Sequence, residues 1–299
     1  MKRPSIPHWF FLLLAINPAA FAQSHALTRS GKPSKLVEAV HRNSIADFRT
    51  LVAAGEEIDA FHYDYETALI ASAKYERVEF VDELIRAKAD LDKQNSTGWN
   101  ALMWAAQRGN VQIVKILVDA GSKIDEQNKD GCTAFLLASR DGNLETINYL
   151  INAGADMGHK NNKGDTALLL AAEGSKPAIL ERLLKLGFDP NSFGSGNFSA
   201  IAKAARSPEA LKVLLAGGAK IDLQIETGVG VRSTTALEMA VVNGWTESVE
   251  VLISAGANPN LSRTGKISPL RIAINRGDKE MIELLKKAGA KDVWKRDPY

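Results

Sequence analysis

The sequence has almost no cysteine and no catalytic or metal-binding pattern. Cys132 is its single cysteine, so no disulfide can form within the chain. The five histidines include no His-x-x-x-His pair, and the motifs His-Glu-x-x-His, Gly-x-Ser-x-Gly and the P-loop do not occur. These absences predict a non-catalytic protein that needs no cofactor or metal and is stabilised by its apolar core alone.

A large excess of one charge is missing as well. The chain holds 37 Lys and Arg against 35 Asp and Glu, which gives a net charge of +2. Lys2 and Arg3 account for this excess, because no acidic residue precedes Gln23. Nucleic-acid binding needs a concentrated basic face, so we expect no nucleic-acid partner.

The apolar run at residues 9–16 is too short for a membrane-spanning helix, which needs about 20 apolar residues. It follows Lys2 and Arg3 and precedes Ala20-Phe21-Ala22, the pattern of a secretory signal peptide with an Ala-x-Ala cleavage site. We expect cleavage after Ala22, with Ala26 as a weaker site, rather than an uncleaved membrane anchor. An exported chain without disulfides fits a bacterial periplasm, and we expect no membrane contact after cleavage.

Two sequence markers recur with one period. The first has the form apolar-x-Ala-Gly-Ala, and its central residues are 33 positions apart four times in succession, then 31, 38 and 33 apart. These central residues are Gly55, Lys88, Gly121, Gly154, Gly187, Gly218, Gly256 and Gly289. The second marker is a Thr, Asn or Ser before a small and an apolar residue, at Thr67, Asn100, Thr133, Thr166, Ser199, Thr235 and Ser268. Two markers with a shared period of this length predict a repeat fold.

The third repeat, residues 95–127, indicates how one unit folds. Gly98 marks a turn, and Asn100 is an N-cap residue that accepts a hydrogen bond from the start of a short helix. A second helix follows over residues 113–118, whose apolar side chains have helical spacing, and Gly121 ends it. A helix pair this short cannot bury its own apolar surface, so successive pairs are expected to stack.

These units resemble those of the ankyrin-repeat family, whose characteristic unit runs Gly-x-Thr-Pro-Leu-His, Ala-Ala, Gly, Val-Val, Leu-Leu and Gly-Ala. Most units here have Ala in place of the Pro of Thr-Pro-Leu, as in the Thr-Ala-Leu that begins at Thr67, and none has the histidine. The resemblance covers residues 36–291 and implies an all-α solenoid of about eight helix-turn-helix units joined by short β-hairpin loops. It also implies a protein partner bound on the concave side, which loop tips and first helices form.

The expected organisation is a signal peptide at residues 1–22, a flexible lead-in at 23–34, the repeat solenoid at 35–291 and a tail at 292–299. In the tail, Trp294 is expected to cover the last apolar face. The sixth repeat loses two residues near Ser207 and Pro208, and the seventh gains five in the loop 225–233. Such an insertion is either neutral or a partner contact. Because both ends of the solenoid have capping units, we expect a monomer.

The candidate binding residues on the concave side are Tyr63, Tyr75, Trp99, Arg108, Arg140 and Asp141. Aromatic residues and Arg are enriched at interface hot spots. Trp99 lies at a turn, so it either contacts a partner or packs on a neighbouring tip, whereas Trp104 is expected in the core. Glu66, Cys132 and Asp165 are expected at exposed tips.

The expected function is that of a periplasmic module that binds, inhibits or protects another protein. By resemblance, exported bacterial ankyrin proteins include protectors of periplasmic enzymes and immunity proteins, and nothing in the residues separates these roles. Two alternatives are a secreted effector that binds a host-cell protein and an enzyme, against which the missing catalytic cluster argues.

Overall fold

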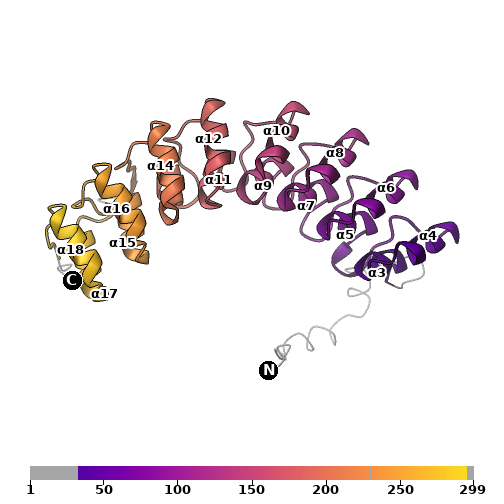
Figure 1. Cartoon of the computed structure of the whole chain (residues 1–299), viewed down its shortest axis with the longest axis horizontal. Helices are drawn as coiled ribbons and strands as arrows, with labels where there is room; N and C mark the ends of the chain where they lie inside the picture. The colour runs from indigo at the N-terminus through magenta and orange to yellow at the C-terminus, as the bar shows by residue number, and fades with distance from the viewer. Residues whose placement is uncertain (1–32, 229–230, 295–299) are drawn as a thin grey trace, which may run out of the picture. The chain divides into compact units, whose positions relative to one another are not determined.

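The computed structural model describes residues 33–228 and 231–294. Their helices form eight successive pairs, each with a first helix, a short turn and a second helix (Figure 1), which confirms the expected all-α repeat architecture. No helix in this described part of the chain is long and apolar enough to cross a membrane. The expected signal peptide at residues 1–22 and the lead-in up to residue 32 lie outside the described residues.

The helices divide between two compact units, of which unit 1 comprises the chain up to Ala105 and residues 110–129. Its elements are α3 (Lys35–His41), α4 (Ile45–Ala53), the 3-10 turn η2 (Tyr63–Tyr65), α5 (Ala68–Lys74), α6 (Val78–Arg86), α7 (Ala101–Arg108) as far as Ala105, and α8 (Val111–Asp119). The first helices α3 and α5 pack together, and α6 packs against both α4 and α8. In these three pairs, a helix contacts its equivalent in the next repeat.

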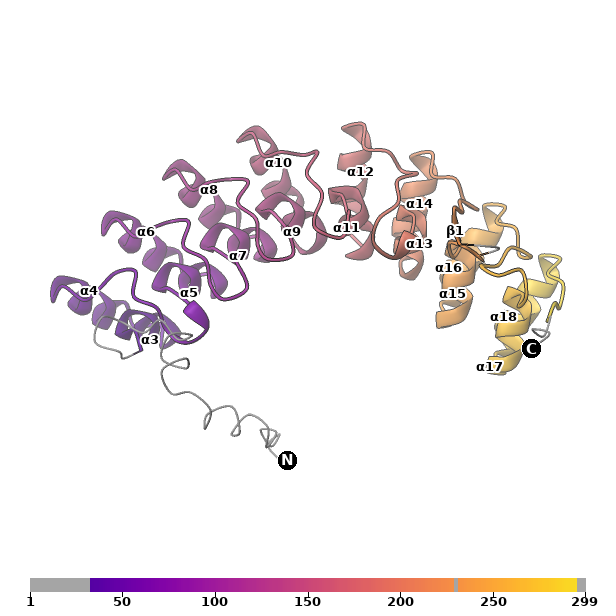
Figure 2. The same cartoon turned by 180° about the vertical axis from the view of Figure 1, so that it is seen from behind.

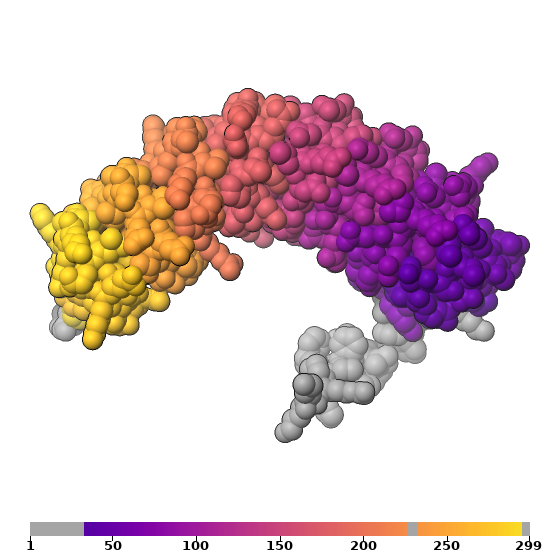
Figure 3. Space-filling model, viewed as in Figure 1, coloured from indigo at the N-terminus to yellow at the C-terminus, as the bar shows by residue number. Residues whose placement is uncertain are grey.

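Unit 2 comprises residues 106–109 and the chain from Asp130 onward. Its elements are α9 (Ala134–Asp141), α10 (Leu144–Asn152), α11 (Ala167–Glu173), α12 (Pro177–Lys185), η3 (Ser195–Asn197), α13 (Ala200–Lys203), η4 (Ala204–Arg206), α14 (Pro208–Ala216), β1 (Glu226–Gly228), β2 (Val231–Arg232), α15 (Ala236–Asn243), α16 (Thr246–Ser254), α17 (Pro269–Arg276) and α18 (Lys279–Lys287). First helices lie on one side and second helices on the other (Figure 2), and Figure 3 shows successive repeats of this unit as one packed surface.

The core of each unit lies between its first and second helices. First helices are buried along most of their length and are rich in alanine, as in Ala167–Glu173, where six of seven residues are buried. The small side chains allow neighbouring first helices to approach closely. Larger apolar side chains such as Phe48, Leu84 and Phe135 fill the remaining space, and each contributes about 1.5–3 kcal/mol when fully buried.

Every first helix after the first repeat begins at the predicted N-cap residue. The side-chain oxygen of Thr67 accepts a hydrogen bond from the backbone N–H of Ile70 at 3.2 Å, and Asn100 accepts one from Met103 at 2.9 Å. The same bond starts the first helices that follow Thr133, Thr166, Ser199, Thr235 and Ser268. Losing one such cap costs about 1 kcal/mol.

Between repeats the chain forms a turn at the tip rather than a regular strand pair, except in repeat seven. In the third repeat the N–H of Asn95 donates to the carbonyl of Trp99 at 2.9 Å, and the N–H of Lys129 in the next tip donates to the carbonyl of Thr97 at 3.1 Å. Gly98 has a φ of +81°, and a Cβ there would lie 2.7 Å from the Lys129 nitrogen. Glycine at this turn therefore allows adjacent tips to bond.

In five repeats an Asp or Asn side chain joins one repeat to the next, at a position that was not among the predicted features. This position lies four residues after the central residue of the first marker. In unit 1, Asp59 accepts the backbone N–H of Asp90 at 3.0 Å, and Asp92 accepts that of Lys123 at 2.9 Å. In unit 2 the same bond runs from Lys220 to Asn191, from Asn258 to Asp222 and from Lys291 to Asn260.

The irregular repeats differ from the expected form in two details. The five inserted residues of repeat seven extend the tip into the antiparallel pair β1–β2, which is the only pair of strands in the described residues. Trp294 was expected to cover the last apolar face, but it is 56% exposed and forms a β-bridge with Ile267 at the final tip. The Arg271 guanidinium, 5.8 Å from its ring centroid, occupies the space beside it.

Candidate functional site

The three aromatic candidate residues lie in unit 1, at a tip and beside the ends of first helices. Tyr63 begins η2 and is 60% exposed, and Tyr75 is the C-cap of α5 and is 42% exposed. Trp99 precedes the N-cap of α7 and is half-buried. The two tyrosines are therefore the accessible large side chains of this group.

Two histidines that are not among the candidate binding residues connect Tyr63 with Tyr75. The ring of His62 meets that of Tyr63 edge-on, with 4.6 Å between centroids, and lies 5.7 Å from the ring of His41. His41 ends α3 and meets the Tyr75 ring edge-on at 5.3 Å. Side chains of the first two repeats thus form a continuous row of rings.

Lys74 extends this row to two tryptophans. Its Nζ lies 5.4 Å from the Tyr75 ring centroid and 5.3 Å from that of Trp104, within the range of cation–π attraction. Trp104 packs against Trp99 with 4.5 Å between ring centroids. Trp99 therefore packs on its own first helix, and Trp104, which was expected in the core, is half-buried. We call this row the aromatic ribbon: Tyr63, His62, His41, Tyr75, Lys74, Trp104 and Trp99.

Glu66 holds the middle of the aromatic ribbon in place. One carboxylate oxygen accepts a hydrogen bond from Nε2 of His41 at 2.9 Å, and the other accepts one from Nζ of Lys74 at 3.0 Å. Glu66 is only 8% exposed, so its charge is compensated by these two donors rather than by water. The carboxylate thereby fixes side chains that come from α3 and α5.

His62 and Lys74 differ in charge at neutral pH. Burial and the nearby His41 lower the pKa of His62 below its usual 6.5, so its ring is uncharged at pH 7. Burial alone would lower the pKa of Lys74, but its bond to Glu66 outweighs this and raises that pKa above 10.5. The aromatic ribbon therefore presents π-faces and polar edges, the chemistry of interface hot spots.

The remaining candidate residues belong to unit 2. Arg108 is exposed at the end of α7. Arg140 forms an ion pair with its neighbour Asp141 at 2.7 Å, and Gln107 also donates to Asp141 at 3.1 Å. The bond to Asp141 raises the pKa of Arg140. Because Arg140 and Asp141 neutralise each other, they offer a partner less charge than their sequence suggests.

Three side chains expected at exposed tips are buried. Glu66, Cys132 at 6% exposure and Asp165 at 2% exposure each stand directly before the N-cap of a first helix. This position turns the side chain back between adjacent tips, where Nδ2 of Asn161 lies 3.8 Å from Sγ of Cys132. Burial raises the pKa of the Cys132 thiol, which makes it a poor nucleophile.

An ion-pair cluster in unit 2, with Asp165 and Lys203 buried and Glu173 exposed, joins Asp165 to two first helices. Nζ of Lys203 donates to Glu173 at 2.7 Å and to Oγ of Ser195 at 2.9 Å, and it lies 3.2 Å from the Asp165 carboxylate. Every member of this cluster already has a partner, so its role is to hold the tip of repeat six on α11 and α13. Within residues 33–228 and 231–294, no three His, Cys, Asp or Glu side chains come close enough to hold a metal ion.

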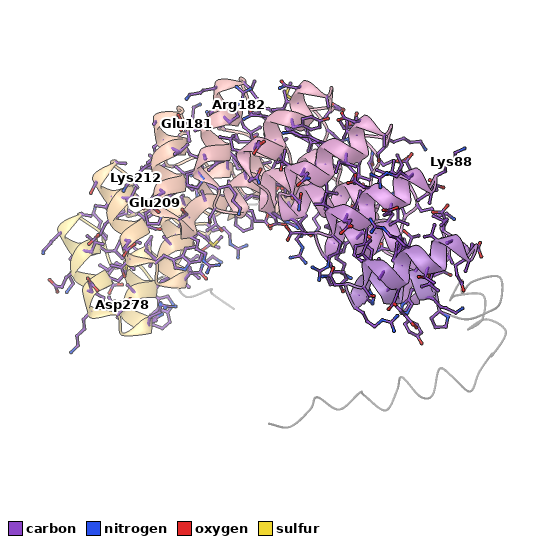
Figure 4. The ribbon with its side chains drawn as sticks, turned by 45° about the vertical axis from the view of Figure 1, so that its right-hand side comes forward. Lys88, Glu181, Arg182, Glu209, Lys212 and Asp278 are labelled. Carbon is purple, nitrogen blue, oxygen red and sulfur yellow. The ribbon has the colours of Figure 1, made fainter. Side chains whose placement is uncertain are left out.

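The second helices of unit 2 form a different kind of surface. Glu181 and Arg182 on α12 and Glu209 and Lys212 on α14 lie on this side (Figure 4). Here α12 and α14 border a shallow groove of about 380 Å³ whose lining includes Leu184, Val213 and Gly217. The groove contains no aromatic side chain among its lining residues, in contrast to the aromatic ribbon.

The comparison with known families agrees with this architecture. A model described as ankyrin repeats in three copies matches residues 36–128, 120–194 and 198–297. Ankyrin repeats are generally protein–protein interaction modules and are typically non-catalytic. Since the matches span nearly all the described residues, this chain belongs to the ankyrin-repeat family.

Proposed function

We propose that this chain is a non-catalytic module that binds a partner protein through the aromatic ribbon of unit 1, and so holds, inhibits or protects that partner. The observation that carries the proposal is the continuous row from Tyr63 to Trp99, with both tyrosines exposed. Its ring-to-ring contacts and the Glu66 bonds hold the side chains in place before a partner arrives. Pre-organised side chains lose less conformational entropy on binding, which favours affinity.

Truncating the aromatic ribbon should weaken the complex without unfolding the chain. We expect Tyr75→Ala and Trp99→Ala each to lower the affinity for a purified partner, first recovered by cross-linking, by about tenfold or more. Tyr149→Ala is the matched control, because Tyr149 lies on the second helix α10. The measurement is a calorimetric titration, with circular dichroism confirming the fold. Affinities equal to that of the Tyr149→Ala variant would contradict the proposal.

We further propose that the protein is exported to a bacterial periplasm. The proposal rests on the sequence pattern of Lys2 and Arg3, the apolar run 9–16 and Ala20-Phe21-Ala22. We expect osmotic shock to release the protein and N-terminal sequencing of the released chain to begin at Gln23. Retention in the spheroplast, or a chain that still begins at Met1, would contradict export with cleavage.

A further inference from the structure

The inserted loop of repeat seven forms one wall of a pocket in unit 2. The other wall is the tip of repeat eight, and the two are joined by the N–H of Arg232, which donates to the carbonyl of Arg263 at 2.9 Å. The pocket has a volume of about 340 Å³. We call it the tip pocket, and its lining residues are Glu226, Arg232, Asn260, Leu261, Ser262, Arg263, Thr264 and Gly265. Glu226 and Arg232 belong to the loop 225–233, so the pocket depends on the insertion.

Two arginines give the tip pocket its positive charge. Arg232 and Arg263 are exposed, and neither guanidinium forms an ion pair with a side chain of the described residues. Glu226 stands opposite Arg232 in the β1–β2 register without an ion pair between them. The nearby Glu238 is buried, and its Oε2 accepts the backbone N–H of Arg263 at 2.9 Å. The charge of Arg263 also attracts the Glu238 carboxylate, but the two form no ion pair, and both guanidiniums remain exposed to a ligand.

The other polar groups of the tip pocket also favour an anion. Ser262 uses its oxygen to accept the N–H of Gly265 at 3.0 Å, and Thr264 uses its oxygen to accept that of Lys266 at 3.3 Å. Each hydroxyl keeps its proton as a donor. The side chain of Asn260 is already bonded to Lys291 and Gly289. Among the described lining residues, two guanidiniums and two hydroxyls thus offer donors, and Glu226 is the one charged acceptor.

We propose that the tip pocket binds the carboxylate side chains of an acidic segment of a partner protein. Guanidinium groups match carboxylates in a bidentate geometry. Pockets for free small molecules are mostly apolar, whereas Leu261 is the only large apolar side chain among the described residues that line this one. Single-stranded nucleic acid would need aromatic stacking platforms, which the lining residues lack. The inference goes beyond the proposed function, because the aromatic ribbon belongs to unit 1.

A direct test is fluorescence anisotropy of a labelled oligoglutamate peptide titrated with the full chain at low salt. We expect Arg232→Gln and Arg263→Gln each to weaken binding about fivefold. Arg206→Gln is the matched control, since Arg206 is exposed on η4 outside the pocket, and should leave affinity unchanged. Glu226→Gln removes the opposing charge and should strengthen binding about twofold or more.

Equal affinities for the Arg232, Arg263 and Arg206 variants would overturn the proposal, as would a Glu226→Gln variant with weaker binding. Displacement of the peptide by acetate or inorganic phosphate at equal carboxylate or phosphate concentration would show a small-anion pocket instead. Tighter binding of an oligothymidylate strand through the same arginines would assign the pocket to nucleic acid. None of these results depends on Tyr75 or Trp99. A negative result for the tip pocket can therefore be distinguished from a negative result for the proposed function.

Discussion

At the scale of single residues, one repeat position decides much of the chemistry of this chain. The residue directly before the first-helix N-cap is buried between tips in the second, fourth and fifth repeats, as Glu66, Cys132 and Asp165. The equivalent residue is the half-buried Trp99 in the third repeat and the exposed Ile267 in the eighth. The same backbone geometry thus organises the aromatic ribbon through Glu66 and a buried ion pair through Asp165. The same position in the repeat therefore supports the aromatic ribbon in one repeat and an ion pair in another.

The Lys203 cluster should be a large single contribution to the stability of unit 2. Lys203→Met leaves the Asp165 carboxylate buried without its cation, and we expect a loss of about 2–3 kcal/mol in the free energy of unfolding. Urea denaturation followed by circular dichroism measures this loss. A variant as stable as the wild type would show that the pair contributes nothing.

The same cluster sets a pH dependence. Burial alone would raise the pKa of Asp165, but hydrogen bonds from Ser195 and the charge of Lys203 outweigh it and hold this pKa below its usual 3.8. A depressed folded-state pKa contributes stability above the usual value and loses it as pH falls through the lower one. The difference in the free energy of unfolding between wild type and Lys203→Met should therefore become smaller in acid. A difference that stays constant with pH would contradict a lowered pKa for Asp165.

Sequence reasoning placed the exposed tyrosines correctly but missed their surroundings. Tyr63 and Tyr75 could be assigned to tip and helix-end positions because the period fixes their register. His41 and His62 come from neighbouring repeats, and their contact depends on side-chain rotamers that no pattern in one repeat specifies. Glu66, Cys132 and Asp165 were misplaced because polar residues beside a turn are usually solvated, whereas packing of adjacent tips encloses this position.

At the scale of elements, helix ends were the most predictable feature. A left-handed residue follows the end of each second helix, and glycine occupies it in seven repeats, as with Gly121 at φ +97°. Lys88 is the exception, with φ +59°. The Asp and Asn residues that join adjacent repeats recur at one fixed position, four residues after the central residue of the first marker. Their hydrogen bonds to the next repeat become evident only when adjacent repeats are placed side by side. At the equivalent position of repeat four stands Gly158, which has no side chain to form such a bond.

Lys88 should therefore be a point of backbone strain. We expect Lys88→Gly to stabilise unit 1 by about 0.5–1 kcal/mol, because a left-handed conformation costs roughly 1–2 kcal/mol for a residue with a Cβ and part of this is offset by the chain entropy of glycine. The exposed side chain makes no core contact, and Figure 4 shows it at the surface. The shift in urea midpoint gives the measurement.

The reciprocal change at the equivalent position of the next repeat is the control. Nothing lies within 4 Å of a Cβ added at Gly121, so Gly121→Lys tests the backbone conformation alone. We expect this substitution to destabilise unit 1 by about as much as Lys88→Gly stabilises it. We therefore expect the two substitutions to change stability in opposite directions. A change in the same direction would rule out the helix-end conformation as the cause.

At the scale of the whole molecule, the two units present different chemistry. Unit 1 carries the aromatic ribbon with its exposed tyrosines, and unit 2 carries the neutralised Arg140–Asp141 pair, the Lys203 cluster and the tip pocket. A chain of repeats allows this because each repeat is stabilised by its neighbours. Surface residues of one repeat can therefore change without disturbing the others.

The central claim is that a partner protein binds to the aromatic ribbon. The most direct measurement places a photo-cross-linking phenylalanine analogue at Tyr75 in living cells and, in a parallel strain, at Tyr149. We expect a covalent adduct with one partner protein from position 75 and none from position 149. Adducts from position 149 alone, or equal yields of the same adduct from both positions, would contradict the claim.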